Sequence, residues 1–117
     1  MPVFTLGIAT TDGVSVCDHL ARCRAVTLFQ IENGAVVAMA SRLREVDACG
    51  NHRSFTDLLA GCDAVICGGV GQGAVNSLRA AGIEPIVLAV PMSLEAAATG
   101  YVAGTLLTTQ ERVCLCG

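Results

Sequence analysis

The sequence has no tryptophan and no lysine, and charged residues make up only 15% of its 117 residues. An average soluble domain has about 25% charged residues. The formal net charge is −3, from seven basic residues, all arginine, and ten acidic residues. Proteins that bind nucleic acid usually present a basic face with several phosphate contacts. This charge balance therefore argues against nucleic acid as a partner.

Aromatic residues are also scarce, at 3%, whereas hydrophobic residues reach 53%. This composition excludes a disordered chain, which would be poor in apolar residues and rich in charge. The sequence lacks an uninterrupted apolar run of about 18 residues, the length that a membrane-spanning helix needs. Residues 1–21 contain no arginine, so the charged start of a secretory signal is missing. We therefore expect one soluble, cytoplasmic domain with no membrane partner.

Hydrophobic patterning and turn residues predict the element order βββαβαβα. Strands are expected at residues 3–9, 25–31, 35–40, 63–67 and 86–89, and helices at 54–60, 74–81 and 93–101. Asn33-Gly34 between two strand-like runs is a strong hairpin signal. The last strands are separated by helices, so they should be parallel. We predict an α/β fold with a mixed five-stranded sheet, in a domain at 1–104 followed by a C-terminal tail at 105–117.

A glycine-rich loop separates the expected strand at 63–67 from the helix at 74–81. It contains Gly68, Gly69, Gly71 and Gly73. Glycines let the backbone approach a ligand closely, and a helix start presents unpaired N–H groups to an anion. The spacing fits neither a P-loop nor the usual dinucleotide fingerprint. The loop is thus a candidate cofactor-binding site, and tight packing of strand on helix is the alternative explanation.

Seven cysteines and two histidines supply the candidate metal ligands. Cys17 and His19 lie in the loop after the first strand, and His52 follows Cys49 in the loop before the first helix. Imidazole and thiolate suit iron, zinc, copper and iron–sulfur species. Cys67, at a strand end beside the glycine loop, is a fourth candidate ligand. We assign the two cysteines at 23 and 62 to the core.

The sequence ends in Cys114-x-Cys116, a spacing that can hold a soft metal or exchange thiols. The alternative is an unstructured tail whose cysteines have no role. The sequence lacks a Gly-x-Ser-x-Gly motif and an obvious set of converging carboxylates, so we expect no enzyme activity.

Several segments resemble the dinitrogenase iron–molybdenum cofactor-binding and biosynthesis family. Residues 17–22 resemble its Ser-x-His-Phe-Gly-Arg segment, and Asn51-His52 resembles a loop histidine. Residues 64–74 and 78–83 resemble its strand, glycine loop and Leu-x-x-Ala-Gly-Ile helix end. Residues 93–97 and 101–104 match its last helix. The resemblance implies a ribonuclease-H-like three-layer fold and a metal–sulfur cofactor of the iron–molybdenum or iron–sulfur type.

The resemblance and the residue chemistry lead to one leading hypothesis, a nitrogenase-accessory-like carrier of a metal–sulfur cofactor. The glycine-loop N–H groups would contact the sulfides, and His19, His52 or a cysteine would bind a metal. The implied partners are proteins that donate or accept the cofactor. The alternatives are a metal-free module that binds a small molecule or nucleotide phosphate, and a thiol redox protein that uses Cys114 and Cys116.

The expected topology also predicts which loops form the site. If the first and fourth strands are parallel neighbours, the loop with Cys17 and His19 and the glycine loop both leave from their carboxyl ends. Ligands of open α/β sheets bind outside those ends. We therefore expect His19 and the glycine backbone to line one cleft, with Cys17 and Cys67 within reach. His52 is expected in the same cleft with less support from the topology.

Overall fold

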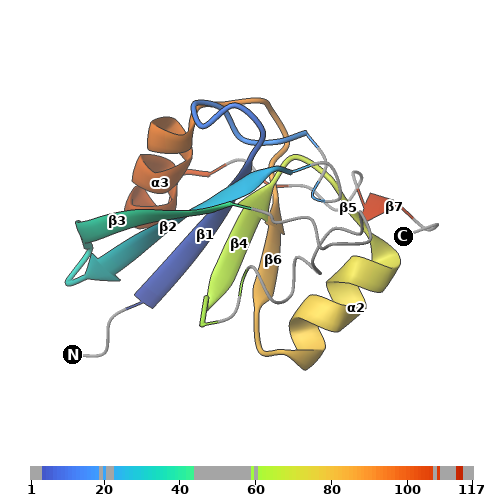
Figure 1. Ribbon diagram of the computed structural model, residues 1–117. Helices are drawn as coiled ribbons and strands as arrows, with labels where there is room; N and C mark the ends of the chain where they lie inside the picture. Colours follow the sequence, from blue (N-terminus) through green and yellow to red (C-terminus); the bar gives the residue numbers. More distant parts are fainter. Residues whose placement is uncertain are drawn as a thin grey trace.

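The computed structural model describes residues 4–18, 20, 23–43, 59, 61–106, 108 and 113–114. Its main sheet has five strands in the order β3-β2-β1-β4-β6 (Figure 1). These strands are β1 (Phe4–Thr10), β2 (Ala25–Glu32), β3 (Ala35–Leu43), β4 (Ala64–Cys67) and β6 (Glu84–Val87). β2 pairs antiparallel with β1 and β3, whereas β4 pairs parallel with β1 and β6. The predicted mixed five-stranded α/β sheet is confirmed.

The hairpin of β2 and β3 forms where the Asn-Gly pair predicts it. Asn33 has a φ of 53° and Gly34 a φ of 76°, the left-handed values that a tight hairpin turn needs at both central positions. Every described side chain of β3 is exposed, so none of the described residues buries this edge strand. Val37 and Met39 are 56% and 67% exposed. The core therefore lies over the other strands.

Two helices cover opposite faces of the sheet (Figure 1). On one face, α2 (Gln72–Ala80) buries Ala74, Val75 and Leu78. They belong to the same cluster as Val65 of β4. On the other face, α3 (Leu94–Ala103) joins a cluster that includes Leu6, Ile8, Phe29 and Ile66 of the sheet. The helix predicted at 54–60 falls almost entirely outside the described residues.

The boundaries of α2 correct two expectations. The helix begins at Gln72, two residues earlier than expected, so Gly73 lies in its first turn rather than in the glycine loop. Gly82, with a φ of 81°, follows the helix end as expected.

The strand after α2 also begins earlier than expected, because β6 starts at Glu84 instead of residue 86. Pro85 is tolerated as the second residue of this strand because β6 is an edge strand, where a missing N–H can face away from the neighbouring strand.

A second, two-stranded sheet was not expected from the sequence. β5 (Val70–Gly71) lies within the glycine loop and pairs parallel with β7 (Val113–Cys114). Val70 is opposite Val113, and Gly71 is opposite Cys114. A segment near the C-terminus therefore lies beside the loop that precedes α2. The sequence did not predict β7, because a strand of two residues is too short to show a hydrophobic periodicity.

The cysteines assigned to the core are where they were expected. Cys23 is 2% exposed and Cys62 is 6% exposed, and both belong to the apolar cluster on the α2 face. Burial raises the pKa of the Cys62 thiol. Within the described part of the chain, no helix is both long and apolar enough to cross a bilayer.

The N-cap of α3 gives a direct test of helix capping in this fold. The side chain of Ser93 accepts a hydrogen bond of 3.1 Å from the N–H of Ala96. We expect Ser93→Ala to lower the free energy of unfolding by about 1 kcal/mol, because that N–H loses its partner. Urea unfolding would measure the loss. Ser77→Ala, at an exposed position inside α2, is the control and should leave stability unchanged or slightly raised.

Candidate functional site

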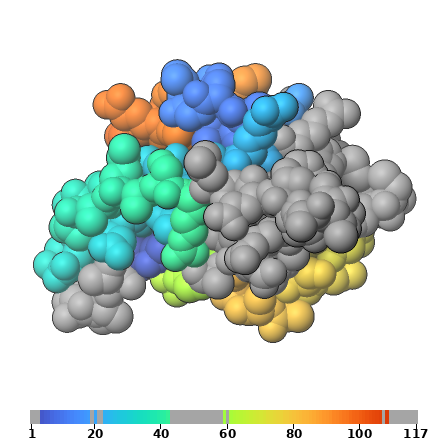
Figure 2. Space-filling model, in the orientation of Figure 1, coloured from blue at the N-terminus to red at the C-terminus, as the bar shows by residue number. Residues whose placement is uncertain are grey.

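The three parallel strands of the sheet end on the same side, and we call this side the carboxyl edge. It comprises the ends of β1, β4 and β6 and the loops that follow them, residues 11–20, 68–71 and 88–93. In Figure 2 the blue loop after β1 lies at the top of the molecule, next to orange residues that follow β6. The expectation that β1 and β4 are parallel neighbours is confirmed.

Main-chain hydrogen bonds join the loop after β1 to the glycine loop. The N–H of Gly68 donates to the carbonyl of Cys17 at 2.7 Å, and the N–H of Leu20 donates to the carbonyl of Gly69 at 2.8 Å. A Cβ on Gly68 would lie 2.8 Å from Cα of Asp18 and 2.9 Å from the Cys17 carbonyl oxygen. Glycine is thus required at position 68 because another backbone occupies the space of a side chain.

The loop after β6 completes the carboxyl edge. The N–H of Val16 donates to the carbonyl of Met92 at 3.0 Å, and the N–H of Leu94 donates to the carbonyl of Val14 at 2.9 Å. The loop after β1 is therefore held on one side by the glycine loop and on the other by the start of α3. Sequence reasoning did not assign residues 88–93 to the site, although a parallel β6 places them there.

Asp12 fixes the first turn of the loop after β1. Its Oδ1 accepts hydrogen bonds of 2.8 Å from the N–H groups of both Val14 and Ser15. These hydrogen bonds stabilise the carboxylate and lower the pKa of Asp12 below its ordinary value. The bond from Ser15 contributes most, and the bond from Val14 comes next. The buried Thr10 hydroxyl donates to the Ser15 carbonyl at 2.7 Å. Local polar contacts thus set the path of the chain toward Cys17.

Two of the four predicted metal ligands are described by the structure. Cys17 lies at the carboxyl edge, is 5% exposed, and accepts a hydrogen bond of 3.3 Å at Sγ from the Thr11 hydroxyl. Cys67 is fully buried at the end of β4. Burial raises the pKa of Cys67 to about 12, with the Gly69 N–H acting in the opposite direction. In the metal-free protein this burial favours the protonated thiol of Cys67.

The two histidines, His19 and His52, lie outside the described residues, so their roles as ligands remain predictions. The described neighbours of His19 in the sequence, Asp18 and Leu20, contact Gly68 and Gly69. Among the residues that the structure describes, no group of three or more His, Cys, Asp or Glu side chains could hold a metal ion.

The start of α2 provides the backbone part of the predicted site. Gly71 is the N-cap and has an extended conformation, with φ of −78° and ψ of 154°. The cap residue makes no side-chain hydrogen bond, and the first turn contains no acidic residue. The first N–H groups of a helix lack partners within the helix and carry partial positive charge. This helix start is therefore suited to an anionic group.

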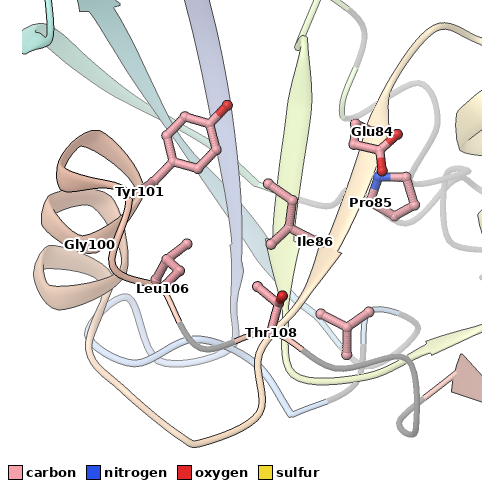
Figure 3. A pocket seen from close by; sticks show the side chains of 9 residues that line it. Glu84, Pro85, Ile86, Gly100, Tyr101, Leu106 and Thr108 are labelled. Atoms are coloured by element: carbon pink, nitrogen blue, oxygen red, sulfur yellow. The ribbon is translucent and has the colours of Figure 1, made fainter.

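Two cavities lie beside α3. One, of about 740 Å³, opens on the α3 face of the carboxyl edge and has an apolar floor that includes Phe29 and Met39, with Arg24 and Glu95 also in its lining. The other, of about 330 Å³, lies between α3 and β6 (Figure 3). Tyr101, Ile86 and Leu106 line it, with Glu84 at one end (Figure 3). No cysteine or histidine of the described residues lines either cavity.

The sequence profile of the family described as dinitrogenase iron-molybdenum cofactor matches residues 3–104. The chain therefore belongs to this family, as its glycine loop and histidine segments predicted. A search of curated protein sequences found no match.

Solved structures support the same fold. The crystal structure of PH0822 has a TM-score of 0.79 at 19% identity, covering 92% of this chain and 96% of that one. A protein from Methanocaldococcus jannaschii, provisionally named a dinitrogenase, has a TM-score of 0.71 at 13% identity, covering 94% and 98%. A Thermotoga protein, provisionally named a NifB protein, has a TM-score of 0.70 at 21% identity, covering 92% and 98%. At these identities the likeness concerns the fold.

Replacing Gly68 tests the close approach of the two loops. We expect Gly68→Ala to lower the free energy of unfolding by about 1–3 kcal/mol, because its Cβ would meet backbone atoms that cannot turn aside. Chemical denaturation would measure the loss. Gly100→Ala is the matched control, because its Cβ would lie 2.9 Å from the flexible end of the Leu106 side chain. Equal losses in the two variants would contradict the special role of Gly68.

The buried Cys67 thiol should resist alkylation in the folded protein. With its pKa raised to about 12, this thiol stays protonated at mildly alkaline pH, and its full burial excludes the reagent. We expect iodoacetamide labelling followed by peptide mass spectrometry to leave Cys67 unmodified in native protein and modified after urea unfolding. Rapid native labelling of Cys67 would show that the end of β4 is accessible and would strengthen its case as a ligand.

Proposed function

We propose that this protein is a carrier that binds a metal–sulfur cofactor at the carboxyl edge and passes it on without catalytic turnover. The observation that carries the proposal is the direct bonding of Gly68 to the Cys17 carbonyl. It brings a segment with thiol and imidazole residues against the glycine loop and the start of α2. Membership of the dinitrogenase iron-molybdenum cofactor family supports the same assignment.

The chemistry of the edge fits a preassembled anionic cluster. Its sulfides would accept hydrogen bonds from the N–H groups in the first turn of α2, where no acidic residue competes. Cys17, His19 and His52 would supply the protein's ligands to the metal, since thiolate and imidazole bind iron and related metals. Cys67 would lie beneath the site as part of the core. The cluster is thus cargo, exchanged with partner proteins that donate or receive it.

The absence of an evident acid–base pair in the sequence motifs favours a carrier over an enzyme. Exchange needs only a few ligands that can be replaced, whereas turnover needs groups positioned on a reacting atom. We also propose that the fold is ribonuclease-H-like with three layers. The strand order β3-β2-β1-β4-β6 and the helices on opposite faces of the sheet support this. As a carrier of this kind the protein would work in the cytoplasm.

Anaerobic titration with iron–sulfur or molybdenum–sulfur clusters tests the carrier function. We expect wild-type protein to form a coloured complex of about one cluster per chain. A His19→Ala/His52→Ala double variant should lose most of this binding because the imidazole ligands are removed. Gln30→Ala, at an exposed position on β2, is the control and should bind as wild type does.

Equal, weak binding by wild type and by the double histidine variant would overturn the proposal. Elemental analysis of protein purified without oxygen adds an independent measurement. Iron, copper or molybdenum well above background would exclude the metal-free alternative, in which the glycine loop and the start of α2 bind a phosphate group.

A further inference from the structure

The larger of the two cavities beside α3 lies where that helix stops covering the sheet. α3 packs on a cluster that includes residues of β1, β2 and β4, but no described residue of β3 belongs to it. The cavity, of about 740 Å³, lies between the β2–β3 hairpin on one side and the loop after β1 with the start of α3 on the other. Sites for small molecules have volumes of about 300–1,000 Å³. This cavity is therefore large enough for an organic ligand, and the function proposed above does not use it.

Main-chain hydrogen bonds hold the walls of this cavity. The N–H of Leu94 donates to the carbonyl of Val14 at 2.9 Å, which joins the start of α3 to the loop after β1. The N–H of Arg24 donates to the carbonyl of Thr10 at 3.0 Å, which joins the residue before β2 to the end of β1. Because backbone bonds already fix these segments, a ligand would lose little free energy in ordering them.

The floor of the cavity is apolar with two hydroxyl groups beside it. Phe29 of β2 is opposite Met39 of β3 in the register, and Thr27 is opposite Ser41. Phe29 is 5% exposed, whereas Met39 is 67% exposed and Val14, on the opposite wall, is 65% exposed. A methionine sulfur makes favourable contacts with aromatic rings, and aromatic pairs gain beyond their burial. This floor is therefore suited to a flat aromatic group.

The charged residues of the lining favour a cation. They are Asp12, Glu95 and Arg24, so two carboxyl groups face one guanidinium. Main-chain hydrogen bonds lower the pKa of Asp12, so its carboxyl group is ionised at neutral pH. The start of α3 is a poor anion site here, because the Ser93 side chain caps it and the N–H of Leu94 is bonded to the loop after β1. An anionic ligand would meet more repulsion than a cationic one.

We propose that this cavity binds a small organic cation that has an aromatic body and a protonated amine. The aromatic body lies on Phe29 and Met39, and the ammonium group faces the carboxylates of Asp12 and Glu95. An aliphatic amine keeps its proton at neutral pH, because its pKa is close to that of lysine, about 10.4. This site is separate from the proposed cofactor site, since it needs neither a thiol nor a metal.

Two naphthalene probes of opposite charge test the inference on the full chain. 2-(1-Naphthyl)ethylamine is a cation at neutral pH, and 3-(1-naphthyl)propanoate has the same ring with a carboxylate. The chain has no tryptophan and one tyrosine, so naphthalene fluorescence is measured with little protein background. We expect the amine to bind at least tenfold more tightly than the acid at low ionic strength, where charge interactions are least screened.

The Met39 methyl group shows whether the amine binds in this cavity. The chain has three methionines, so NMR spectra of ¹³C-methyl methionine are simple, and we expect the Met39 signal to shift when the amine is added. Met39→Lys places a positive charge on the floor and should weaken amine binding at least tenfold. Val37→Lys is the matched control, because Val37 is also exposed on β3 but does not line the cavity. Circular dichroism would check that both variants fold.

A double variant tests the two carboxylates. In Asp12→Asn/Glu95→Gln both charges are removed, while the asparagine oxygen can still accept the hydrogen bonds of the turn. We expect its affinity for the amine to fall about tenfold, because two carboxylates near the ammonium group are lost. Glu32→Gln/Glu84→Gln removes two acidic charges outside the lining of the cavity and should bind the amine as wild type does.

Three results would overturn the inference. They are binding of the acid as tight as that of the amine, a Met39 methyl signal that does not move, and wild-type affinity in Asp12→Asn/Glu95→Gln. None of them bears on the carrier proposal, which depends on the cluster titrations and the histidine variants. Selective binding of the amine by a protein that takes up no metal–sulfur cluster would support this inference and leave the carrier proposal overturned.

Discussion

The contact between the backbone at Gly68 and the backbone at Cys17 and Asp18 is the constraint on which the carboxyl edge depends. It is a contact of main chain with main chain, and neither partner can relieve a clash by changing rotamer. Its geometry follows from the parallel pairing of β1 with β4, which sends both loops off the same end of the sheet. The same contact fixes the start of β5, and through β5 it determines where α2 begins and where β7 lies.

All four cysteines whose side chains the structure describes lie in the apolar cluster on the α2 face. Desolvation favours the protonated form of the Cys67 thiol in the metal-free protein, and Cys67 packs among apolar side chains there. Cys114 is instead carried to the glycine loop by a short ladder at the margin of the fold. Burial alone does not separate packing cysteines from candidate ligands, because the proposed ligand Cys17 is also buried.

The sequence was sufficient to predict the five strands of the main sheet and the helices α2 and α3, because these depend on local signals. Asn33-Gly34 specifies the hairpin turn, Ser93 caps α3, and the apolar run before Gly68 identifies a buried strand. It did not reveal β5, β7 or the early start of α2. In the sequence, Gly71 and Gly73 are typical of a flexible turn. Gly71 becomes a strand residue only because it pairs with Cys114 of β7, which is distant in the sequence. The side-chain environment of Cys67 was also beyond prediction, since a strand end gives no indication of how completely its last residue is covered.

The pairing of β1 with β4 also has a kinetic consequence. The N–H of Thr5 donates to the Asp63 carboxylate across 58 residues of sequence, whereas the β2–β3 hairpin closes through two turn residues. Ordering a long loop costs entropy before the contacts that repay it can form, so distant strand pairs form slowly. The hairpin can exist before β4 joins the sheet, but the carboxyl edge cannot. The newly made chain must therefore pair β1 with β4 before the carboxyl edge, at which we propose that a cofactor binds, can form.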